Sequence, residues 1–120
     1  MAVGLEQAEY GRFHIWVDDP EQEGVRRRYT YLLGDNIGMG EKVYKTQMLE
    51  QPIGNRVPVD ETPDHRQVIR NCNLSLTLLG RKDIAKLLPK DDEPLIIYQN
   101  KSDIQSDAQK PAFTEFMLAS

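Results

Sequence analysis

The most regular stretch of this sequence is residues 68–79, which read VIRNCNLSLTLL. Apolar and polar residues alternate along it, and the apolar set is Val68, Cys72, Leu74, Leu76 and Leu78. Only Arg70 interrupts that set. A period of two places alternate side chains on opposite faces of a strand. The stretch therefore predicts a long, half-buried antiparallel strand.

The same period of two recurs elsewhere in the chain, over shorter runs. These further strand candidates are residues 13–17, 25–33, 42–49, 95–98 and 113–118. One helix is predicted over residues 81–88, because Ile84, Leu87 and Leu88 recur at helical spacing before a proline. An N-terminal turn over residues 5–10 is a further candidate.

These patterns predict a mainly β domain with one short helix near residues 81–88. We expect an antiparallel sandwich or a partly open barrel of about six strands, and the alternative is an α+β fold with a single antiparallel sheet. A single domain is expected over residues 1–120, because this length suits one hydrophobic core. Long loops are expected at about 34–40, 51–64 and 100–111, where glycine, proline or polar residues break the alternation.

Composition and charge limit the classes of protein that the chain can belong to. It carries 15 Lys+Arg against 19 Asp+Glu, a formal net charge of −4. There is no signal-peptide pattern, and no apolar run approaches the ~20 residues that span a bilayer. The one cysteine, Cys72, cannot form an internal disulfide, which favours a reducing compartment. We expect a protein of the cytoplasm, or of a particle assembled inside the cell, without secretion or membrane contact.

The sequence contains no recognised motif for catalysis, a cofactor or a metal. The glycine-rich residues 34–40 lack the Gly-Lys pair of a P-loop. One cysteine and two distant histidines, His14 and His65, do not supply the clustered ligands of a zinc site. We therefore expect no cofactor, no metal and no enzymatic activity. A small hydrolase or nuclease that uses Asp18, Asp19 or His14 is the catalytic alternative.

Two long, partly apolar loops on a small domain favour a role in assembly. The leading hypothesis is a non-enzymatic structural subunit that forms homo-oligomers or docks onto other proteins of a complex. A viral particle, a tail or a connector ring is an example of such a complex, by analogy of architecture. The candidate interface residues are the apolar ones of these loops: Ile37, Met39, Ile53, Val57 and Val59.

A monomeric binding module is the alternative function, with nucleic acid or a small ligand held on a β face. Its candidate nucleic-acid or anion contacts are Arg26, Arg28, Tyr29 and Tyr31, because cations and aromatic rings together bind single strands. The acidic net charge argues against nucleic acid. Carboxylates across the adjacent turn also argue against it, since cross-strand ion pairs would account for the arginine run.

Overall fold

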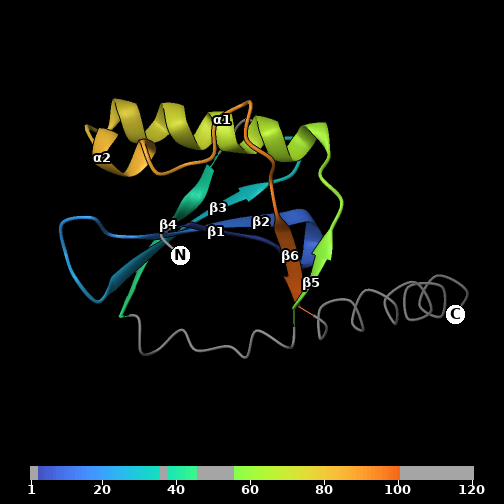
Figure 1. Cartoon of the computed structure of the whole chain (residues 1–120), viewed down its shortest axis with the longest axis horizontal. Helices are drawn as coiled ribbons and strands as arrows, with labels where there is room; N and C mark the ends of the chain where they lie inside the picture. The colour runs from blue at the N-terminus through green and yellow to red at the C-terminus, as the bar shows by residue number, and fades with distance from the viewer. Residues whose placement is uncertain (1–2, 36–37, 46–55, 101–120) are drawn as a thin grey trace, which may run out of the picture.

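The computed structural model describes residues 3–35, 38–45 and 56–100. These residues form a six-stranded sheet with a long helix, α1, across one face (Figure 1). The strands are β1 (Val3–Gln7), β2 (Arg12–Asp18), β3 (Val25–Leu32), β4 (Gly38–Lys45), β5 (Arg56–Val59) and β6 (Ile97–Asn100). The helices are a 3-10 turn η1 (Glu9–Gly11), α1 (Pro63–Leu78) and α2 (Lys82–Ala85).

The prediction of a mainly β protein with about six strands and a short helix is confirmed. The six strands form one open, mixed sheet in the order β4-β3-β2-β1-β6-β5. Neighbouring strands are antiparallel except β1 and β6, which run parallel. The helix expected near residues 81–88 is present as α2.

The hydrophobic core lies between α1 and one face of the sheet. Alternation along the strands decides which side chains enter it, because successive residues point to opposite faces. The buried side chains of the three central elements are Phe13, Ile15, Val17, Tyr29, Tyr31, Val68, Ile69, Cys72 and Leu76. Burying an aliphatic or aromatic side chain is worth roughly 1.5–3 kcal/mol. The sheet therefore depends on α1 to cover its apolar face.

The strand predicted over residues 68–79 is wrong, because this stretch forms most of α1. Val68, Cys72 and Leu76 are buried at intervals of four residues, which is close to one helical turn. Leu74 and Leu78, predicted to share their face, are instead 62% and 86% exposed. A spacing of four fits a period of two as well as a helix, so these three buried positions alone do not separate the two structures.

The start of α1 is defined by a local capping arrangement. Thr62 is the N-cap residue and Pro63 occupies the first helical turn, where its missing N–H costs nothing. The backbone N–H of Thr62 donates to Nδ1 of His65 at 2.9 Å. Nε2 of His65 lies 3.1 Å from Oε1 of Gln7 on β1, so the imidazole ties the helix start to the sheet.

The three expected loops and the strands expected at 42–49 and 113–118 differ from the structure or lie partly or wholly outside the described residues. The loop expected at 34–40 includes the start of β4, and the loop expected at 51–64 contains β5 and the first residues of α1. Residues 46–49, 51–55 and 101–118 lie outside the described residues, so the strand at 113–118 and nearly all of the loop at 100–111 are not described. The N-terminal turn over 5–10 is only partly right, because β1 precedes η1 there.

Candidate functional site

The side of the sheet opposite α1 has no helix over it in the described part of the chain (Figure 1). We call this side the open face. Its side chains alternate with the core residues of β2 and β3, and register places them in rows with alternate residues of β4. The open-face side chains of these strands are Arg12, His14, Trp16, Asp18, Arg26, Arg28, Thr30, Leu32, Lys42 and Tyr44.

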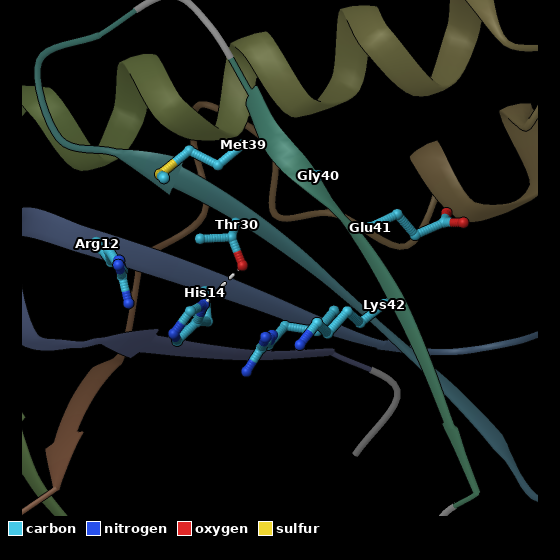
Figure 2. A pocket seen from close by; sticks show the side chains of 8 residues that line it. Arg12, His14, Thr30, Met39, Gly40, Glu41 and Lys42 are labelled. Atoms are coloured by element: carbon cyan, nitrogen blue, oxygen red, sulfur yellow. Dashed lines mark hydrogen bonds between the residues drawn. The ribbon is translucent and has the colours of Figure 1, made fainter.

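A shallow depression of about 230 Å³ lies on the open face, beside edge strand β4. Figure 2 shows Arg12, His14 and Lys42 projecting to the same side of the sheet, while Glu41 turns away from them. Nδ1 of His14 lies 2.9 Å from Oγ1 of Thr30. Burial, together with the charges of Arg28 and Arg12, lowers the pKa of His14 to about 4. The imidazole is therefore neutral at pH 7, and the positive charge of the depression comes from the arginines and Lys42.

Beside the depression, two aromatic rings and a guanidinium form a compact group, the aromatic–arginine stack, made of Trp16, Arg28 and Tyr44. The ring centroids of Trp16 and Tyr44 are 5.4 Å apart. The guanidinium carbon of Arg28 lies 5.5 Å from each centroid, within the range of a cation–π contact. Nε of Arg28 and Nε1 of Trp16 are buried without a hydrogen-bond partner in the described residues.

The four predicted nucleic-acid or anion contacts do not lie together. Tyr29 and Tyr31 point into the core beneath α1, where burial raises the pKa of both phenols. Arg26 lies on the open face but pairs with Asp18 at 2.7 Å. Only Arg28 belongs to the stack. Trp16 and Tyr44 supply the aromatic surface that the sequence analysis assigned to the two buried tyrosines.

The predicted interface residues are also dispersed. Met39 is 51% exposed on β4, whereas Val57 and Val59 are half-buried on β5, at the opposite edge of the sheet. Val59 packs against the core. Ile37 and Ile53 lie outside the described residues.

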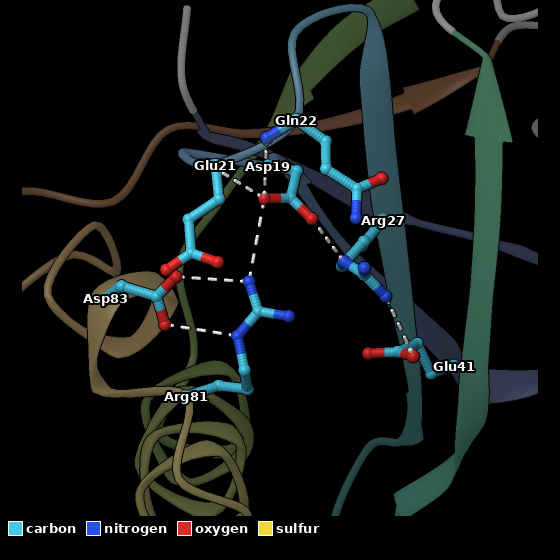
Figure 3. A network of polar contacts seen from close by, with 7 residues as sticks. All are labelled: Asp19, Glu21, Gln22, Arg27, Glu41, Arg81 and Asp83. Atoms are coloured by element: carbon cyan, nitrogen blue, oxygen red, sulfur yellow. Dashed lines mark hydrogen bonds and ion pairs between the residues drawn. The ribbon is translucent and has the colours of Figure 1, made fainter.

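Asp19, one of the catalytic candidates, instead holds a structural network at the β2–β3 turn (Figure 3). Its carboxylate accepts hydrogen bonds from the backbone N–H of Glu21 at 2.8 Å and from Nε of Arg27 at 2.8 Å. Arg81, which precedes α2, approaches the same carboxylate at 3.5 Å. Burial alone would raise the pKa of Asp19, but these hydrogen bonds and cations keep it below its usual value.

The other candidates for chemistry have structural surroundings as well. Asp18 is paired with Arg26, and the cross-strand ion pairs expected for the arginine run are present. Cys72 is buried between α1 and the sheet, and this burial raises the pKa of its thiol to about 12. Across residues 3–35, 38–45 and 56–100, no group of three or more His, Cys, Asp or Glu is placed to hold a metal ion. Within the same ranges, no helix has the length and apolarity to cross a membrane.

The second accessible feature is the free edge of β4. This strand pairs with β3 on one side and with no described strand on the other. Seven of its eight residues are exposed, and Tyr44 is the exception. Val43, at 55% exposed, gives the middle of this edge an apolar side chain.

Comparisons with protein-family models, with curated proteins and with solved structures find no match to this chain.

Proposed function

We propose that this protein is a non-enzymatic assembly subunit that pairs with a second copy of itself through the edge of β4. The observation that carries the proposal is the exposed eight-residue edge strand. Unpaired N–H and C=O groups along such an edge can form a ladder with another strand. Short edges, prolines and charged side chains normally block this pairing, and the charges of β4, Glu41, Lys42 and Lys45, have both signs. Residues 38–45 contain no proline.

The sequence of β4 favours one antiparallel register between two copies. When Val43 lies opposite Val43 of the second copy, Glu41 lies opposite Lys45, and Lys42 opposite Tyr44. Each of these two pairs occurs twice because of the two-fold symmetry. Opposite charges facing each other across strands contribute roughly 0.2–1 kcal/mol each, and an exposed cation–aromatic contact contributes about 0.5–1 kcal/mol. A register centred on Glu41 would place Glu41 opposite Glu41, and one centred on Lys42 would place Lys42 opposite Lys42. Repulsion between these like charges disfavours both registers.

This register also keeps the two sheets continuous. Glu41, Val43 and Lys45 lie on the α1 side of the strand, since Glu41 is in register with the buried Tyr29. With the two-fold axis at Val43, the helices of both copies lie on one side, and both open faces lie on the other.

Size-exclusion chromatography with light scattering tests the proposal directly. The wild-type chain is expected at twice the 13.8 kDa mass of a monomer. Lys45→Glu should give a monomer, because it places a carboxylate opposite Glu41. Lys45 itself has no ion pair in the described residues, so its substitution should leave the fold intact. Lys86→Glu, at the exposed C-cap position after α2, is the matched control and should remain dimeric.

A charge-swap mixture makes the test specific for the register. Glu41→Lys alone should also be monomeric, since it faces Lys45 of its partner with a like charge. An equimolar mixture of Glu41→Lys and Lys45→Glu should recover the dimer, because both contacts are then Glu–Lys pairs. A monomeric wild type at all concentrations, or a dimer unaffected by Lys45→Glu, would refute the proposal. Circular dichroism confirms that each variant is folded, since Glu41 also contacts Arg27 at 3.2 Å.

A further inference from the structure

The open face has a local charge opposite to that of the whole chain. Arg26 and Arg56 on this face are neutralised by Asp18 and Glu6, at 2.7 and 3.2 Å. Arg12, Arg28 and Lys42 have no carboxylate within ion-pair distance in the described part of the chain. Three uncompensated cations therefore lie around one shallow depression.

These cations are interleaved with flat aromatic surface. Arg28 lies over the rings of both Trp16 and Tyr44, and Lys42 is in register with Arg28 on the adjacent strand. Surfaces that combine a positive groove with aromatic platforms are typical of single-strand binding, because cations contact phosphates while rings stack on bases. In a duplex the bases stack on one another, so they are not available to stack on the aromatic rings of the protein.

From this arrangement we infer that the open face binds single-stranded nucleic acid. The phosphate backbone contacts Arg12, Arg28 and Lys42, and a base stacks on the exposed side of the aromatic–arginine stack. The depression, at about 230 Å³, is smaller than the roughly 300–1,000 Å³ of sites that enclose a small molecule. Its open, shallow form suits one unit of a polymer that runs across the sheet.

Two kinds of polar group within the site add hydrogen-bonding capacity: N–H groups without a partner and a neutral imidazole. Nε of Arg28 and Nε1 of Trp16 have no partner in the described residues, although both atoms are buried. His14 presents a neutral imidazole held by Thr30. The acidic net charge of −4 lowers the overall affinity, and it makes binding depend on the local cations.

The expected salt dependence follows from the number of cations. Each phosphate contact on a single strand contributes a slope of about −0.7 to log K against log salt. Three contacts give a slope of about −2, so a four-fold rise in salt weakens binding roughly 20-fold. Arg12→Ala or Lys42→Ala should each reduce the slope by about 0.7.

Intrinsic fluorescence gives a direct readout, because Trp16 is the only tryptophan of the chain. The probe is an oligothymidylate, titrated at low salt, with a duplex of the same length and inorganic polyphosphate as comparisons. Oligothymidylate should quench Trp16 and bind more tightly than the duplex. Polyphosphate should bind more weakly and without base stacking. Binding should persist in the monomeric Lys45→Glu variant, which separates this inference from the proposed dimer.

Variants of the stack decide between base stacking and simple attraction of anions. Tyr44→Ala should weaken oligothymidylate binding at least five-fold, whereas Tyr44→Phe keeps the ring and should retain it. Lys86→Ala, at the exposed C-cap position after α2, is the control for Lys42→Ala and should bind as the wild type does. The inference is overturned if oligothymidylate leaves Trp16 fluorescence unchanged. It is also overturned if polyphosphate binds equally well and Tyr44→Ala has no effect.

Discussion

Truncation of leucines along α1 provides the sharpest test of the fold. Leu76 is 1% exposed and belongs to the core, whereas Leu78, two residues on, is 86% exposed. Leu76→Ala removes three buried carbon groups, worth about 0.8 kcal/mol each in transfer free energy. The cavity left behind adds to this loss, so we expect a fall of roughly 2.5–5 kcal/mol in the free energy of unfolding. Leu78→Ala should change that free energy by less than about 0.5 kcal/mol.

Urea denaturation followed by circular dichroism measures both variants against the wild type. Leu74→Ala serves as a second exposed control, because Leu74 is 62% exposed. In a strand, Leu74, Leu76 and Leu78 would lie on one face and would lose similar amounts of stability. Comparable losses at all three positions would therefore refute the helix. A large loss at Leu76 alone agrees with the packing of α1 on the sheet.

Three further predictions concern buried titratable side chains. Asp19→Asn should lower the free energy of unfolding by about 2–3 kcal/mol in urea denaturation, because it weakens charged hydrogen bonds that include Arg27. Stability should fall as the pH drops from about 6.5 towards 4, because the pKa values of His14 and His65 are lowered in the fold. Over that range the unfolded chain binds protons that the native state does not. Melting temperatures measured against pH check this, and a flat profile across that range would contradict it. Cys72 should react with a thiol reagent only on unfolding, because its thiol is buried and has a pKa of about 12; rapid labelling of the native protein would contradict its placement.

The strands could be predicted from the sequence where a turn and a period of two agreed. Residues 13–17 and 25–33 show the alternation, less clearly than residues 68–79, on either side of a polar turn, and β2 and β3 lie there. β1 lacks this alternation of apolar and polar residues, since Gly4 leaves only a short apolar pattern around Leu5. It becomes a strand because β2 and β6 pair with both of its edges. That pairing between distant segments cannot be predicted from the residues of β1 alone.

The error over α1 has a specific physical cause. Val68, Cys72 and Leu76 satisfy a helix and a strand equally, and the polar residues between them complete a false alternation. Ile69 separates the two structures, because it is buried beside Val68 on a helix but would face away from it on a strand. The Thr62-Pro63 pair is a helix-start signal that agreed with Ile69.

The open face could be predicted in part. The alternation of β2 places His14 and Trp16 opposite Phe13 and Ile15, so one aromatic platform is visible in the sequence. Its completion by Tyr44 depends on the register between β3 and β4, which brings two segments together after a loop. The register between β2 and β3 shows why Arg28 differs from Arg26: only Arg26 lies opposite a carboxylate, Asp18.

The two proposals share strand β4, and the dimer register makes contacts on both sides of it. On β4, Glu41, Val43 and Lys45 alternate with Lys42 and Tyr44, so one set supports the α1 side of a dimer while the other forms part of the open face. In the register centred on Val43, Lys42 of each copy lies opposite Tyr44 of its partner. The two aromatic–arginine stacks then meet on one continuous surface. A strand of nucleic acid long enough to cross both copies would bind the dimer more tightly than the monomer, since its second contact is intramolecular.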